Sequence, residues 1–138
     1  MHFYYCALFI IKQQEMKNAI NWFEIPVENY ERAKKFYSTI YDTEIVDHPM
    51  PEGKYGILPC DHENGGVGGA IIESERVKPS EEGSTLYLNG GEDLDIPLAK
   101  IEAAGGKVLM PKTSIGENGF MAQFIDTEGN KLALHSMK

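Results

Sequence analysis

Residues 21–37, NWFEIPVENYERAKKFY, decide the fold. In the first part of this stretch, alternate side chains should point to opposite faces of a β-strand, because successive strand residues alternate in direction. One face carries Phe23, Ile25 and Val27, and the other carries Ile20, Trp22 and Glu24. From Asn29, a suitable helix N-cap, apolar residues recur at helical spacing. The stretch therefore predicts a strand followed directly by an amphipathic helix.

The remaining sequence repeats this order of elements. Further short strands are expected at 43–48 (TEIVDH), 54–59 (KYGILP) and 69–74 (GAIIES), and in the second half at 84–89 (STLYLN), 107–111 (KVLMP), 120–126 (FMAQFID) and 131–136 (KLALHS). A second helix should begin near Asp95, with Pro97 in its first turn, and should end at Gly105. Strand, helix and three strands therefore occur twice, at an offset of roughly 60 residues.

This repeat predicts an α+β fold of two βαβββ modules, which form a cupped mixed sheet with the helices outside. Module one covers about residues 16–78 and module two about residues 79–138, within one domain. A single module of this kind cannot bury both faces of its sheet. Two packed modules leave a cupped sheet surface that encloses a cavity.

Composition and charge exclude several classes of function. At 138 residues the chain has the length of one ordinary domain. A net charge of -8 and a pI near 4.9 disfavour nucleic acid and anionic membrane surfaces as partners. No apolar run reaches the roughly 18 residues that a membrane-spanning helix needs. The two cysteines, Cys6 and Cys60, form neither a disulfide framework nor a CxxC site, which favours reduced thiols in a cytoplasmic protein.

The first residues have two interpretations. The segment HFYYCALFII is apolar, but no Lys or Arg precedes it and no small-residue cleavage site follows it, as a signal peptide would require. Residues 1–15 are therefore either an extension ahead of a domain that begins at Met16, or an additional edge strand. We adopt the extension as the expectation.

Four stretches resemble the vicinal oxygen chelate superfamily, which includes glyoxalase I, bleomycin resistance proteins, fosfomycin resistance enzymes and extradiol dioxygenases. They are WFEIPVENYERAKKFY (22–37), GGAII (68–72), LAKIEAAGGKVLMP (98–111) and FIDTEGNKLALHS (124–136). The resemblance covers nearly everything after Met16 and implies the two-module fold. It does not fix the reaction, because this fold hosts isomerases, thiol transferases, dioxygenases and non-catalytic binders.

The resemblance also bears on metal binding. Metal-binding members place one ligand on the first strand and one on the last strand of each module. In this chain those positions fall on Trp22, on Gly69 or Ala70, on about Thr85 and on Ala133. None is an ordinary ligand of a divalent metal, and a catalytic zinc ion generally needs three protein ligands. We therefore expect a glyoxalase-like protein without the usual metal ligands and without a cofactor.

Polar residues lie two positions beyond three of these four sites. They are Glu24 beyond Trp22, Tyr87 beyond Thr85 and His135 beyond Ala133. A shift of two keeps a side chain on the same face of its strand. We therefore expect Glu24 and His135 to face one central cavity as catalytic proton acceptors. Alternatively, Glu24 pairs with a lysine at the rim of the cavity or holds a buried water. His135 is alternatively a surface residue.

Three further residues are expected to bind the substrate. Trp22 suits a cavity wall, since an indole offers a stacking face and one hydrogen-bond donor. Tyr87 is either a phenol donor in the cavity or a core residue. Gln123 shares a strand face with Met121 on the penultimate strand and is a weaker candidate for the lining.

Two classes of function follow. The first is a small-molecule enzyme, a lyase or isomerase that transfers a proton, because cavities can raise the pKa of a carboxylate and imidazoles titrate near neutrality. The second is a non-catalytic binder that sequesters an aromatic or amphipathic compound, as the bleomycin resistance proteins do. A homodimer is expected in either case, because these modules often pair between chains.

The loop CDHENGGVGG (60–69) has the composition of a metal or phosphate site but not the pattern of one. Its residues Asp61, His62 and Glu63 superficially resemble a metal site, but a solvated loop is the favoured interpretation. Its glycines do not form a phosphate loop, since no GK[ST] follows and the next element is a strand. Sequence spacing supports no Ser–His–Asp or Cys–His constellation anywhere in the chain.

Overall fold

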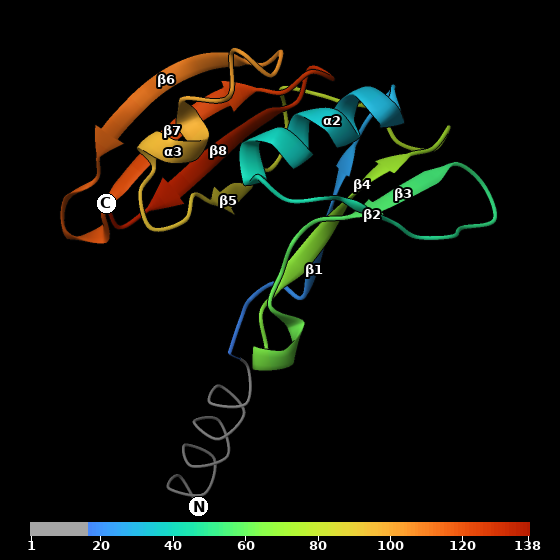
Figure 1. Ribbon diagram of the computed structural model, residues 1–138, viewed down its shortest axis with the longest axis horizontal. Coiled ribbons are helices and arrows are strands. Elements are labelled where there is room, and N and C mark those ends of the chain that lie inside the picture. Colours follow the sequence, from blue (N-terminus) through green and yellow to red (C-terminus); the bar gives the residue numbers. More distant parts are fainter. Residues whose placement is uncertain (1–16) are drawn as a thin grey trace, which may run out of the picture.

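The computed structural model describes residues 17–138 (Figure 1). Module one contains β1 (Trp22–Pro26), α2 (Tyr30–Tyr41), β2 (Val46–Asp47), β3 (Lys54–Ile57) and β4 (Gly68–Glu73). Module two contains β5 (Tyr87–Asn89), α3 (Asp95–Leu98), β6 (Lys107–Ser114), β7 (Phe120–Ile125) and β8 (Lys131–Ser136). The expected N-terminal extension, residues 1–15, lies outside the described residues.

Each module forms its own four-stranded mixed sheet. In module one the strand order is β1-β4-β3-β2, with β1 and β4 parallel and the other neighbours antiparallel. In module two the order is β5-β8-β7-β6, with β5 and β8 parallel and the other neighbours antiparallel. The two sheets therefore have the same topology, and the predicted α+β fold of two modules is confirmed.

Helix α2 forms where the sequence predicts it and is fixed at both ends. The side chain of Asn29 accepts a hydrogen bond from the Arg32 amide at 3.0 Å, which caps the N-terminus. Asp42 adopts the left-handed conformation that ends the helix, with a φ of 51°. The apolar stripe is buried as expected and consists of Tyr30, Ala33, Phe36, Tyr37 and Ile40.

Helix α3 is much shorter than predicted. It covers only Asp95–Leu98 and is followed by turns up to Gly105, although Ile101 is buried as the predicted stripe requires. Short helices are marginal, and here turns replace the predicted helix beyond Leu98. No helix within residues 17–138 has the length and apolar character needed to cross a membrane.

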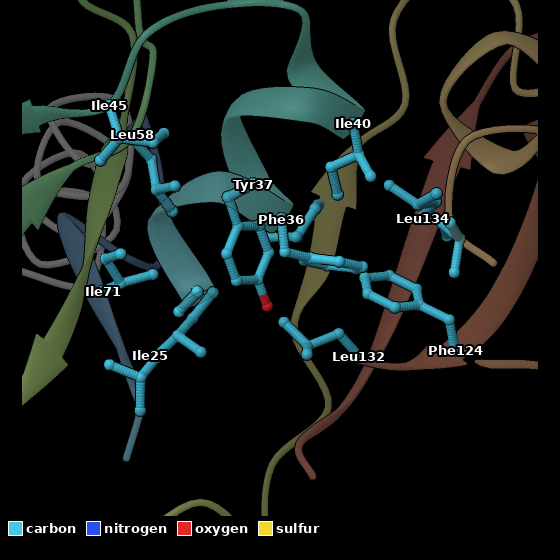
Figure 2. Close-up of a cluster of buried hydrophobic side chains, with 14 of the residues drawn as sticks. Ile25, Phe36, Tyr37, Ile40, Ile45, Leu58, Ile71, Phe124, Leu132 and Leu134 are labelled. Atoms are coloured by element: carbon cyan, nitrogen blue, oxygen red, sulfur yellow. The ribbon is translucent and has the colours of Figure 1, made fainter. Parts of the chain in front are cut away.

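The hydrophobic core joins the two modules. Figure 2 shows Ile25 and Ile71 of the first sheet on one side of Phe36 and Tyr37, with the second sheet on the other side. The rings of Phe36 and Phe124 lie 6.1 Å apart between centroids. Because α2 packs on both sheets, the two modules bury one continuous core.

A polar turn between β7 and β8 also ties module two to module one. The hydroxyl of Tyr37, buried in the core, donates to the Asp126 carboxylate at 2.7 Å. The side chain of Asn130 donates to the carbonyl of Pro26 at 2.6 Å. Burial and the adjacent Asp126 carboxylate raise the pKa of Tyr37 well above its usual value, which keeps the phenol protonated as a donor.

Glu128 completes this turn by binding the start of α2. Its carboxylate accepts hydrogen bonds from the backbone amides of Glu28 and Asn29 at 2.9 and 2.7 Å. It also pairs with the Arg32 guanidinium at 2.7 Å, while the Glu128 side chain itself is fully shielded from solvent. Burial alone would raise the pKa of Glu128, but the hydrogen bonds, led by that of Arg32, outweigh burial and lower it. We call residues 126–130 the Glu128 turn.

Candidate functional site

Trp22, Glu24 and Tyr55 form a cluster on the first sheet, on the face opposite the one that packs on α2. The indole Nε1 of Trp22 donates to the Tyr55 hydroxyl at 2.7 Å. Burial and then the hydrogen-bonding Glu24 carboxylate raise the pKa of Tyr55, although the Trp22 donor opposes them. The Glu24 side chain is exposed at the edge of this group. We call these three residues the Trp22 cluster.

Small residues on β4 allow the Trp22 cluster to form. Trp22 is aligned with Gly68 and Glu24 with Ala70 on the neighbouring strand β4. Tyr55 comes from β3, which pairs with the other side of β4. Because Gly68 and Ala70 project little from the sheet, side chains from β1 and β3 meet above β4.

A second group lies on the second sheet. Tyr87 and Gln123 are both aligned with Ala133, so they share the face that His135 also occupies. Tyr87 is 54% exposed, and Tyr87 and His135 line one cavity of about 450 Å³. The Nε2 atom of His135 lies 2.7 Å from the Asn118 carbonyl. A carbonyl only accepts, so Nε2 carries a hydrogen and Nδ1 is the proton acceptor of the neutral ring.

The structure unites some of the predicted site residues and separates others. It places Glu24 with Trp22 on the first sheet, and His135 with Tyr87 and Gln123 on the second. Glu24 lines a separate cavity of about 270 Å³ beside β1, which His135 does not reach. Glu24 and His135 thus line two different cavities, beside β1 and beside β8. Their catalytic roles remain predictions.

Sequence spacing did not predict the contacts of Tyr55 and Asn118. Tyr55 alternates with the buried Gly56 in KYGI, so period-two spacing places it on the face away from the core. Its contact with Trp22 depends on the order of the strands, which a sequence pattern does not supply. Asn118 contributes only its backbone carbonyl, so its identity gave no signal.

Comparison with known proteins identifies the family. The family model described as the Glyoxalase/Bleomycin resistance protein/Dioxygenase superfamily matches residues 19–134. The chain belongs to this superfamily. The vicinal oxygen chelate resemblance in the sequence is thereby confirmed.

Relatives in the glyoxalase superfamily cover most of this chain. CFP32 of Mycobacterium bovis, whose name only suggests a glyoxylase, is 30% identical over 117 residues, which are 83% of this chain and 44% of CFP32. The chain thus spans less than half the length of this relative. A glyoxalase/bleomycin resistance protein from Albidiferax ferrireducens T118 has a TM-score of 0.68 at 18% identity and covers 85% of this chain and 97% of its own. TnmS3, an antibiotic binding protein from Streptomyces sp. CB03234, has a TM-score of 0.60 at 23% identity. The match covers 86% of this chain and 95% of TnmS3.

The metal positions of the glyoxalase superfamily do not suit a metal in this chain. The resemblance assigns two of these positions to Trp22 and Ala133, whose side chains offer no ligand for a divalent ion. Gly69 or Ala70 at the second position offers no ligand either, and Thr85 at the third is not an ordinary ligand of a divalent metal. No three His, Cys, Asp or Glu side chains within residues 17–138 are close enough together to hold a metal ion. The residues that the resemblance assigns to the metal centre therefore do not suit a metal, and the absence of a cofactor stays a prediction.

Proposed function

We propose that the protein binds a small molecule with an aromatic or amphipathic portion at the Trp22 cluster. The hydrogen bond from Trp22 Nε1 to the Tyr55 hydroxyl carries this proposal, because it holds an aromatic face in place before any ligand arrives. The exposed Glu24 carboxylate beside it suits a ligand with a hydrogen-bond donor or a positive charge. The net charge of -8 favours a neutral or cationic ligand over an anionic one.

The relatives support a small-molecule ligand in general terms. TnmS3 is an antibiotic binding protein with the same fold, which favours sequestration without turnover. We further propose that binding here needs no divalent metal, because the superfamily's ligand positions hold residues such as Trp22 and Ala133. A chelator should then leave ligand affinity unchanged.

Proton transfer by a lyase or isomerase is the second candidate. It draws on the Glu24 carboxylate beside the protonated Tyr55 phenol, because a base and a neutral donor together can remove a carbon-bound proton and stabilise the resulting oxyanion. His135, with Nδ1 as acceptor and Tyr87 nearby, is the alternative base. Exchange of the carbon-bound protons of hydroxyacetone with D2O tests this candidate. Loss of exchange in E24Q or in H135A would identify the base, and no exchange in the wild type would contradict it.

Replacing Glu24 by glutamine should weaken ligand binding far more than it changes stability. We expect the affinity for berberine, a flat aromatic cation, to fall about tenfold, or ~1.4 kcal/mol, because the anionic acceptor beside the indole is lost. Trp22 is the single tryptophan, so quenching of its fluorescence reports binding directly at the cluster.

The matched control is Glu117→Gln, which removes a charge from an exposed loop position away from Trp22. Each variant should unfold in urea within about 0.5 kcal/mol of the wild type. Titrations in EDTA should give the same affinities as titrations without it. Equal affinities of E24Q and E117Q for berberine would refute the site, and a loss of binding in EDTA would refute metal-free binding.

We also propose a homodimer. Large apolar side chains are exposed on the strands of both sheets, among them Val46, Tyr87 and Leu109. A second copy of the chain would cover such surface and enclose the open face of the Trp22 cluster. Light scattering at micromolar concentration should therefore give twice the chain mass of 15.4 kDa. A monomeric mass would contradict the dimer.

We propose that the protein is located in the cytoplasm. Two cysteines are too few for a disulfide framework, and within residues 17–138 Cys60 is a free thiol. Cell fractionation tests this location, and recovery of the protein outside the cytoplasm would contradict it.

A further inference from the structure

The loop between β3 and β4 brings a thiol and an imidazole together. The Sγ atom of Cys60 lies 3.8 Å from Nδ1 of His62, which is hydrogen-bond distance for sulfur. Sequence spacing did not predict this pair, because two residues of an extended chain at this separation need not meet. Here the chain folds back, with the Gly66 amide donating to the Asp61 carbonyl at 2.8 Å. The glycine-rich loop thus builds a Cys–His pair.

Gly68 provides the space into which this pair packs. A Cβ atom at Gly68 would lie 3.0 Å from Cys60 Cβ, 3.2 Å from His62 Cε1 and 3.3 Å from Trp22 Cζ3. The His62 ring stacks on Trp22, with centroids 6.1 Å apart and an angle of 22° between the planes. The imidazole is therefore held against the indole, with Nδ1 toward the thiol.

Cys60 lies at the edge of an acidic groove. Cys60 is partly buried and lines a groove of about 460 Å³ between the end of α2 and the turn after β5. The charged residues of this groove are Asp42, Asp61, Glu92, Asp93 and Lys100. Lys112 and Lys138 lie 3.7 and 3.9 Å from Asp93 and offset part of the negative charge. The groove as a whole remains negative, so it repels anions and admits neutral or cationic molecules.

We propose that Cys60 is a covalent modification site for soft, uncharged or cationic electrophiles, with His62 as the base that accepts the thiol proton. With an alkyl iodide, the sulfur–carbon bond forms as the carbon–iodine bond breaks. Iodide leaves with the bonding electron pair, and the thiol proton passes to His62 Nδ1 and then to solvent. The charged or titratable groups around the imidazole are Asp61 and Glu63, which flank His62 in the sequence, and Tyr55 and Glu24, which belong to the cluster of the stacked Trp22.

The test measures alkylation of Cys60 in a full-length Cys6→Ser background, where Cys60 is the single thiol. Iodoacetamide should modify Cys60 at pH 7 at least about fivefold faster than it modifies the same residue in H62Q, because the base is lost. The advantage should disappear near pH 9.5, where an ordinary thiol ionises without help. The control is H48Q, since His48 is also exposed but its Nδ1 faces the Pro49 carbonyl.

Charge selectivity gives a second readout that does not depend on any variant. The ratio of the alkylation rate with iodoacetamide to the rate with iodoacetate should be larger at Cys60 than for glutathione. Added salt should lower this ratio at Cys60. Equal rates for the wild-type loop and H62Q at pH 7, with both proteins folded by circular dichroism, would overturn the role of His62. An iodoacetamide-to-iodoacetate ratio equal to that of glutathione would overturn the selectivity.

Discussion

Replacing Glu128 by alanine should lower the free energy of unfolding by roughly 3 kcal/mol, since hydrogen bonds to charged groups are worth ~1.5–3 kcal/mol each and are not additive. The Glu128 carboxylate accepts hydrogen bonds from the amides of Glu28 and Asn29 and from the Arg32 guanidinium. Alanine leaves the two amides at the start of α2 without their acceptor and loosens the contact between the modules. Urea unfolding followed by circular dichroism measures the loss. The control is Glu117→Ala, an exposed glutamate expected to change stability by less than about 0.5 kcal/mol.

Glu128→Gln tests whether the negative charge is the source of this stability. Because the pKa of Glu128 is lowered in the folded protein, its charge stabilises the fold above the unfolded-state pKa of about 4.3. The contribution is lost as the pH falls through the lower folded-state pKa. The stability difference between the wild type and E128Q should therefore be full at pH 7 and should shrink below about pH 4. A difference that stays constant down to pH 3 would show that hydrogen-bond geometry, and not charge, is responsible.

The elements of module one could be predicted because their signals are local. The stripe from Tyr30 to Ile40, the cap at Asn29 and the alternation of β1 all lie within a few residues of one another. The prediction of a long α3 was wrong for a related reason. Periodicity at Ile101 indicates burial, but a turn buries this residue as well as a helix does. The spacing of apolar residues predicts which residues are buried. In a short segment it does not determine whether the backbone forms a helix or a series of turns.

The candidate site was less predictable because it depends on contacts that are distant in sequence. Period two placed Trp22 and Glu24 on one face correctly, yet their partner Tyr55 reaches them across β4. Whether Glu24 and His135 share a cavity depends on how the two sheets are placed against each other. Tyr37 and the Glu128 turn hold the two modules together through interactions that no spacing rule predicts.

Replacing Gly53 by alanine should lower the free energy of unfolding by roughly 3 kcal/mol or more, through two separate costs. The φ of Gly53 is +82°, a conformation that costs a residue with a Cβ about 1–2 kcal/mol. The added Cβ would also overlap the carbonyl oxygen of Glu73, which belongs to the backbone and cannot rotate away. Gly83→Ala separates the two costs, because its φ is +95° and a Cβ there meets nothing within 4 Å.

The Gly53→Ala substitution should also disturb the proposed binding site at the Trp22 cluster. Lys54, the next residue, is aligned with Glu73 at the start of the β3–β4 pairing, and Tyr55 follows it. Relieving the overlap must move β3 away from β4, which lengthens the hydrogen bond between Trp22 and Tyr55. We therefore expect G53A to shift the Trp22 fluorescence and weaken berberine binding even where the protein is still folded, whereas G83A should lose only about 1–2 kcal/mol of stability and bind normally. Equal losses of stability in the two variants would mean that β3 can move without cost. The Trp22 cluster would then not be held in place by the strand pairing, and pre-organisation would no longer explain binding there.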